Sequence, residues 1–77
     1  MKAKEIGATV RAIRSEKSLT TTKLADMVGI SQAQISRLEN GQQGFRSGTL
    51  VKIAKALKTP PFRLFMTDKE WAKWLKK

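Results

Sequence analysis

Residues 21–41 carry the pattern that most constrains this chain: two short apolar stripes separated by a glycine and a serine. Apolar residues recur at helical spacing on both sides of the turn, at Leu24, Ala25, Val28, Ile35 and Leu38. Gly29 can end the first helix because glycine tolerates a left-handed backbone, and Ser31 can cap the second by accepting from a first-turn amide. Ala25 is small enough to let two helices cross closely. The pattern therefore predicts two helices joined by a tight turn, with Gly41 ending the second.

The side of the second helix opposite Ile35 and Leu38 carries no acid and no large apolar residue. At about 100° per residue, this outward face holds Gln32, Ala33, Ser36 and Arg37. Glutamine can bond an adenine edge twice, arginine can bond a guanine edge twice, and alanine can touch a thymine methyl. We expect these four residues to contact DNA bases, as in a helix-turn-helix whose second helix enters the major groove. Face composition alone also allows a solvated face on a small helical bundle.

A longer pattern extends on both sides of this unit, from about Ile6 to Phe65. Its most specific part is Ile35-Ser36-Arg37-Leu38-Glu39-Asn40-Gly41, and further parts are Val10-Arg11-Ala12-Ile13-Arg14, Leu19-Thr20, Leu24-Ala25, Gly29-Ile30-Ser31, Thr49-Leu50, Ile53-Ala54-Lys55-Ala56-Leu57 and Leu64-Phe65. On these residues the chain resembles the Cro/lambda-repressor-type (Xre-like) helix-turn-helix DNA-binding family. It departs from the family where Thr21 replaces a glutamine that contacts a phosphate and braces the recognition helix. Phe45 and Arg46 replace a proline and a serine.

The resemblance also implies which other residues serve the site. It places the start of the second helix and the loop after the third against the DNA backbone. The phosphate contacts it implies come from Thr21, Thr22, Asn40, Gln43 and Arg46. It further implies a structural pair, in which Arg14 of the first helix meets Glu39 at the end of the recognition helix.

Apolar spacing predicts further helices around this unit. We expect a first helix over residues 2–17, a fourth capped by Ser47 or Gly48, and a last helix over residues 68–76. A short fifth helix can start at Pro61, since Thr59-Pro60-Pro61 breaks the fourth. The last helix begins with a capping box of Thr67 and Glu70. The fold class is therefore all-α: a compact five-helix repressor-like helix-turn-helix bundle with a short C-terminal sixth helix.

The chain divides into a helix-turn-helix DNA-binding domain, residues 1–66, and a C-terminal amphipathic helix, residues 67–77. Thr20 is expected to cap the second helix, and Gly7 to allow close packing of the first. Phe45 is expected to close the end of the core, with a contact to the DNA backbone or a partner as the alternative.

Apolar residues gather near the C-terminus, at Phe62, Phe65, Trp71, Trp74 and Leu75. Such a face is too apolar to be left in water. Two burials are open: the last helix folds back over its own chain near Ile6 and Phe65, or it packs on the second subunit of a homodimer. Tryptophans opposite lysines also suit a membrane-surface helix, but this segment is short for that and no membrane is expected.

The formal net charge is +10, which favours polyanionic partners. Residues 40–67 contain no acid, and their bases are Arg46, Lys52, Lys55, Lys58 and Arg63. The chain has no cysteine, no histidine and few carboxylates, so we expect no metal site, no cofactor and no enzyme. No signal peptide and no run of about 20 apolar residues is visible, so we expect a cytoplasmic, nucleoid-associated protein.

Together these features predict a sequence-specific DNA-binding transcriptional regulator. We expect a repressor that binds a palindromic operator as a homodimer, because one short recognition helix reads too few base pairs for specificity. The alternative is an antitoxin of a toxin–antitoxin pair, which binds a toxin and autoregulates its own operon. In both cases the nucleic-acid partner is double-stranded DNA.

Overall fold

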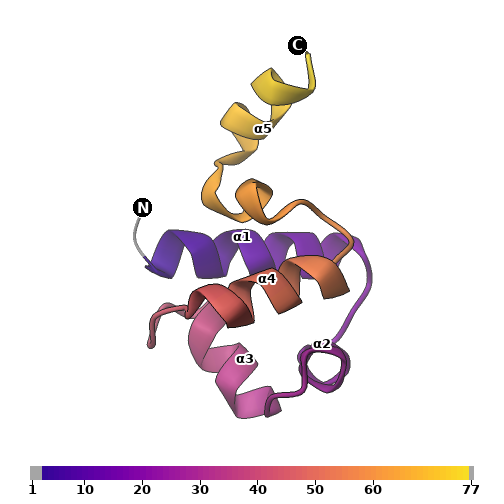
Figure 1. The fold of residues 1–77 in the computed structure, drawn as a ribbon, viewed down its shortest axis with the longest axis vertical. Coiled ribbons are helices and arrows are strands. Elements are labelled where there is room, and N and C mark those ends of the chain that lie inside the picture. The colour runs from indigo at the N-terminus through magenta and orange to yellow at the C-terminus, as the bar shows by residue number, and fades with distance from the viewer. Residues whose placement is uncertain (1–2, 77) are drawn as a thin grey trace.

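A helical bundle with one helix projecting from it is formed by residues 3–76, the part of the chain described in this computed structural model (Figure 1). The elements are α1 (Ala3–Glu16), α2 (Thr21–Val28), α3 (Gln32–Glu39), α4 (Ser47–Ala56), the 3₁₀ helix η1 (Pro61–Phe65) and α5 (Asp68–Leu75). No strand occurs among these residues, and the predicted all-α class is confirmed. Lys2 and Lys77, which the predicted ranges include, lie outside the described residues.

The turn between α2 and α3 follows from local backbone chemistry. The Thr20 side chain accepts a hydrogen bond from the Lys23 N–H at 3.0 Å and starts α2. Gly29 ends α2 in the left-handed conformation, at φ 85°, where side chains are strained. Ser31 caps α3 and forms a capping box with Gln34, so that both backbone groups at this helix start are paired. The predicted helix boundaries of this unit are confirmed.

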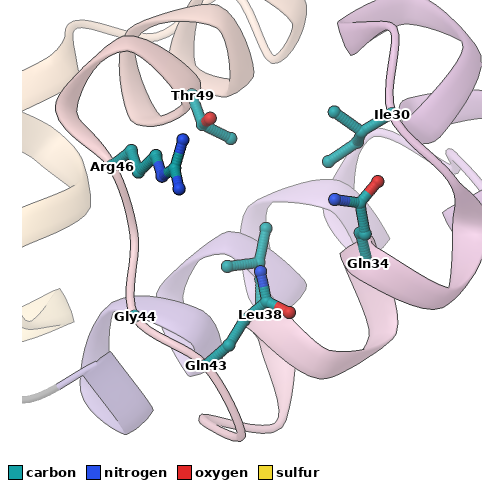
Figure 2. A pocket seen from close by; sticks show the side chains of 7 residues that line it. All are labelled: Ile30, Gln34, Leu38, Gln43, Gly44, Arg46 and Thr49. Carbon is teal, nitrogen blue, oxygen red and sulfur yellow. The ribbon is translucent and has the colours of Figure 1, made fainter.

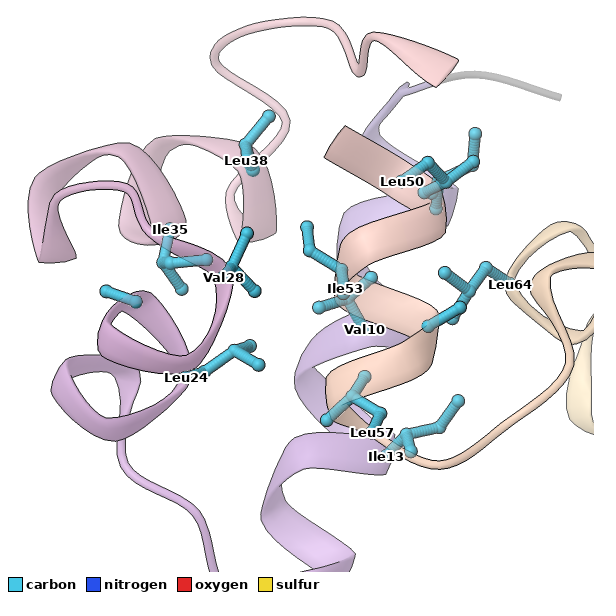
Figure 3. Close-up of a cluster of buried hydrophobic side chains, with 13 residues drawn as sticks. Val10, Ile13, Leu24, Val28, Ile35, Leu38, Leu50, Ile53, Leu57 and Leu64 are labelled. Atoms are coloured by element: carbon cyan, nitrogen blue, oxygen red, sulfur yellow. The ribbon is translucent and has the colours of Figure 1, made fainter. Parts of the chain in front are cut away.

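The core lies between the helix-turn-helix unit on one side and α1, α4 and η1 on the other (Figure 3). Its buried apolar residues are Ile6, Val10, Ile13, Leu24, Ala25, Val28, Ile35, Leu38, Leu50, Ile53, Ala54, Leu57 and Leu64. The apolar stripes predicted for α1, α2, α3 and α4 each supply members of this cluster, which is why these helices can pack together. Phe45 is partly buried against the cluster, as expected for a residue that closes its end.

Close contact between α1 and the C-terminal end of α3 depends on glycine. A Cβ atom on Gly7 would collide with the carbonyl oxygen of Leu38 and lie 2.8 Å from that of Glu39. Gly41, at φ 72°, lies equally close to Lys4, because a Cβ there would be 2.7 Å from the Lys4 Cα. Both glycines let the backbone of α1 approach the C-terminal end of α3.

Three predicted details are wrong or incomplete. The cap of α4 is Arg46, with no side-chain cap bond, and Ser47 is already the first helical residue. The short fifth helix is a 3₁₀ helix rather than an α-helix. The break before it comes at Lys58, whose left-handed φ of 54° precedes the proline pair. Ser18, just after α1, is also left-handed, at φ 57°. Non-glycine residues rarely adopt this conformation, so sequence alone gave no signal for Lys58.

α5 projects from the side of the bundle opposite α3, and none of its described residues is buried (Figure 1). Its predicted capping box forms, with the Thr67 N–H donating to Glu70 at 3.0 Å and the Glu70 N–H donating to Thr67 at 3.1 Å. Hydrogen bonds to the Glu70 carboxyl from the Thr67 backbone N–H and from the Thr67 side chain lower the pKa of that carboxyl. The stabilisation that they give α5 is therefore present at neutral pH and is lost as the pH falls through that lowered pKa.

In the described part of the chain, no helix is long and apolar enough to cross a membrane.

Substitution of Gly7 by alanine tests the α1–α3 contact. We expect Gly7→Ala to lower the free energy of unfolding by at least about 1–3 kcal/mol, because the new methyl group meets rigid backbone. Urea denaturation measures the change. The matched control is Gly48→Ala in the first turn of α4, where a Cβ meets nothing within 4 Å. The control should be neutral or stabilising by up to about 1 kcal/mol. Equal effects of the two substitutions would contradict the close approach.

Candidate nucleic-acid interface

The outward face of α3 presents the four residues that the sequence predicts as base contacts. Gln32, Ala33 and Arg37 are exposed and Ser36 is half-buried. Ile35 and Leu38 point the other way, into the core. The helix is anchored by its apolar side, so the orientation of its polar side is fixed by packing.

Gln32 is held by hydroxyl groups from both helices of the turn. Its Nε2 donates to the Thr21 Oγ1 at 3.1 Å and to the Ser36 Oγ at 3.2 Å. Thr21 stands at the start of α2, so this contact joins the two helices at their exposed ends. The shorter threonine thus reaches Gln32 from the position where the resemblance led us to expect a glutamine.

Arg37 contacts the loop that follows α3. Its Nε donates to the Gln43 Oε1 at 3.0 Å. Gln43 is half-buried and lines a cavity of about 270 Å³ between α3 and the start of α4, with Gln34 and Leu38 on the helix side (Figure 2). Arg46 reaches into the same cavity from the end of this loop that precedes α4 (Figure 2). Gln43 therefore contacts Arg37 and lines the same cavity as Arg46.

The remaining residues predicted to contact phosphate lie at exposed helix ends. Thr22 is exposed in the first turn of α2, and Asn40 is exposed at the C-cap of α3. With Thr21 and the loop residues, they border the outward face of α3 on two sides. This arrangement places the residues predicted to read bases in the middle and those predicted to bind the DNA backbone at the edges, the layout that major-groove recognition requires.

Arg14 and Glu39 form the bidentate pair that the sequence resemblance implied. The Arg14 Nε donates to the Glu39 Oε2 at 2.7 Å, and the Arg14 Nη2 donates to the Glu39 Oε1 at 3.1 Å. A third bond runs from the Arg14 Nη1 to the Leu19 carbonyl at 2.7 Å. The Glu39 side chain is only 4% exposed, so this pair faces the interior rather than DNA.

Sequence reasoning missed the role of Arg63. It stands in the basic stretch of residues 40–67, yet it is a buried residue of η1 whose side chain contacts α5. Its guanidinium donates to the Met66 carbonyl at 3.1 Å and to Asp68 at 3.0 Å, and it stacks 5.2 Å from the centre of the Trp71 ring. We call this contact of Arg63 with Asp68 and Trp71 the joint between η1 and α5. Asp68, five residues after Arg63, and Trp71 are its only sequence signals.

A family model with the description helix-turn-helix matches residues 10–64. The chain belongs to the helix-turn-helix family of the Cro and lambda-repressor type. This family binds double-stranded DNA, and its members regulate transcription rather than catalyse reactions.

Named relatives agree with this membership. Over 55 residues the chain is 47% identical to the HTH-type transcriptional repressor RghR of Bacillus subtilis, a match that covers 70% of this chain and 41% of that protein. The restriction-modification controller protein C.AhdI from Aeromonas hydrophila has a similar structure, with a TM-score of 0.80 and 28% identity over 82% of this chain and 96% of that one. The P22 c2 repressor, solved with a synthetic operator, has a TM-score of 0.72 and 30% identity over 77% of this chain and 89% of that one. The chain spans 40–56% of the length of the curated relatives that it matches.

Replacement of Arg14 by alanine tests whether the Arg14–Glu39 pair is structural. Arg14→Ala leaves the buried Glu39 carboxylate without its partner, and we expect the free energy of unfolding to fall by about 3 kcal/mol. Thermal and urea denaturation measure the loss, and Arg11→Ala, exposed on the same helix, is the control. A variant that binds DNA more weakly but melts at the wild-type temperature would overturn the assignment.

Proposed function

We propose that the chain is the DNA-binding part of a transcriptional repressor that binds a palindromic operator as a homodimer. The observation that carries the proposal is the outward face of α3, where Gln32 and Arg37 stand exposed on a helix anchored by buried Ile35 and Leu38. Both side chains offer hydrogen bonds of the kind that read base edges. A bound repressor would act by excluding the polymerase from the promoter.

Phosphate contacts are assigned to the residues that border this face. Thr21, Thr22, Asn40 and Arg46 surround it at the start of α2 and in the loop before α4. Arg46 adds a charge beside the first turn of α4, where amide groups already point outward and favour an anion. These contacts would set the register of α3 in the groove without reading sequence.

The homodimer is assigned to the apolar face around α5. Phe62 is 42% exposed, Phe65 48%, Trp74 46% and Leu75 64%, with Trp71 half-buried beside them. Phe62 packs on both tryptophans, with ring centres 6.2 Å from Trp71 and 5.2 Å from Trp74, so the face is preorganised. Because α5 leaves the bundle opposite α3, a second copy can pack here without covering the recognition helix (Figure 1).

The fold-back alternative finds less support than the dimer. The aromatic residues of α5 contact η1, and none of the described α5 residues is buried against α1 or α4. The same exposed face favours a second candidate function, an antitoxin that holds a toxin there and represses its own operon. The two functions differ in the occupant of the face and share the DNA-reading surface.

Selection of bound duplexes from a random DNA library tests the proposed function. We expect enriched sites with two-fold symmetry, whose half-site centres lie about 34–36 Å or 10–10.5 base pairs apart. Enrichment of a single asymmetric half-site would remove the homodimer from the proposal. A library with no enriched sequence at all would reject sequence-specific binding.

Arg46 should contribute charge and not specificity. We expect Arg46→Ala to weaken binding to the selected operator and to random duplex alike, and to flatten the slope of log affinity against log salt by about one unit. Titrations at several salt concentrations measure the slope. Lys69→Ala, which removes an exposed charge from α5, is the control and should leave the slope unchanged. An unchanged slope for Arg46→Ala would show that this residue does not touch phosphate.

The dimer face is tested by truncating its exposed members. We expect Trp74→Ala combined with Leu75→Ala to raise the dimer dissociation constant at least about tenfold, because large side chains dominate interface energies. Analytical ultracentrifugation measures the constant, and Lys73→Ala on the same helix is the control. Dimers of unchanged strength would place the interface elsewhere. A wild-type chain that stays monomeric at every concentration would favour the antitoxin.

A further inference from the structure

We propose that Gln43 is a positioning residue for Arg37, which it holds so that the two terminal amino groups of the guanidinium face the groove and select guanine. This inference rests on the proposed operator binding and goes further by assigning a base preference and the residue that enforces it. It also changes the role predicted for Gln43, from a phosphate contact to a partner of the reading residue.

The loop that carries Gln43 is fixed at both ends. The Gly41 N–H donates to the Leu38 carbonyl at 3.2 Å and the Gln42 N–H to the Arg37 carbonyl at 2.9 Å, so the chain leaves α3 along a defined path. On the far side of Gln43, Phe45 is packed against the core. Gln43 itself is half-buried, which restricts its side chain, and it lines the cavity beside α3 (Figure 2). The acceptor Oε1 is therefore offered to Arg37 by a loop that is tied to the bundle.

The bond to Gln43 uses the inner donor of the arginine fork. The Arg37 Nε–H points to the Gln43 Oε1, and the guanidinium forms no other hydrogen bond within residues 3–76. The four N–H groups of the two terminal nitrogens therefore stay available in one plane, and one from each nitrogen points outward from the terminal edge. Guanine offers two acceptors in the major groove, N7 and O6, which match this edge. Adenine offers one acceptor and one donor, and its donor would oppose the arginine.

Preorganisation gives the bond its effect on binding. An arginine without a partner samples many rotamers and loses that freedom when it binds a base, which reduces affinity. An arginine already held by Gln43 loses less, so the gain appears only at the base pair that Arg37 reads. A phosphate contact from Gln43 would strengthen binding to every sequence alike.

This difference supplies the experiment. The probes are the operator selected from the random library, its variants with each base pair of one half-site replaced, and a random duplex. Arg37→Ala first identifies the guanine position, as the one at which the variant no longer discriminates between bases. We expect Gln43→Ala to lower the preference for guanine at that position by about three- to tenfold and to leave affinity for random duplex and the salt slope unchanged. Gln42→Ala is the matched control, because it truncates the same residue type one position earlier in the same loop, and it should change none of these.

A double-mutant cycle separates positioning from an independent contact. In the Arg37→Ala background, Gln43→Ala should change operator affinity by less than about twofold, because its only proposed partner is gone. Gln43→Glu keeps an acceptor for the Arg37 Nε and should preserve the guanine preference, while its negative charge weakens binding to all sequences. Circular dichroism and melting temperatures check that all variants are folded.

Two results would overturn the positioning role. One is a loss from Gln43→Ala that is equal on operator and random duplex. The other is losses from Arg37→Ala and Gln43→Ala that multiply in the double variant. In either case Arg37 still reads its base and the proposed function stands. If the wild-type chain enriches no sequence at all, the proposed function fails before Gln43 is tested.

Discussion

The bidentate bond between Arg14 and Glu39 is the interaction on which the placement of the recognition helix depends. One guanidinium binds both oxygens of a carboxylate at the end of α3 and the Leu19 carbonyl just before α2. An almost fully buried carboxylate is stable only with its partner in place, so alternative positions of the helix end leave a charge uncompensated. Gly7 makes the contact sterically possible by bringing the α1 backbone against the same helix end. This one desolvated pair therefore fixes the end of α3 against α1, although its two residues lie 25 positions apart in the chain.

How well the sequence predicts each interaction depends on how far apart its residues lie in the chain. Thr20, Gly29 and Ser31 act on backbone groups within a few residues, so their chemistry specified the turn and the helix bounds correctly. Arg14 and Glu39 are 25 residues apart, and only the family resemblance brought them together. From sequence, Arg63 is only one base of an acid-free stretch, because nothing local shows that its guanidinium binds Met66 and Asp68 and stacks on Trp71.

The loop before α4 shows why the details of the candidate site could not be predicted. Phe45 and Arg46 depart from the family pattern here, so the path of the loop was open, and the expected serine cap of α4 is replaced by Arg46. The partner of Gln43 depends on that path and is visible only in three dimensions. In contrast, the face of α3 followed from its 3.6-residue period, because buried Ile35 and Leu38 fix which side points out.

The joint at Arg63 has a consequence for how this small domain can change. The apolar core ends at Leu64, the family match ends at the same residue, and the described part of α5 adds nothing to the buried cluster. The helix beyond the joint is held by its own cap, a stacked guanidinium and aromatic contacts with η1. Replacement of that helix by another sequence, or its extension into a longer domain, leaves every core contact of the bundle intact. The proposed partner face on α5 and the proposed DNA-reading face on α3 thus lie in physically separate parts of the chain, so either can be exchanged without the other.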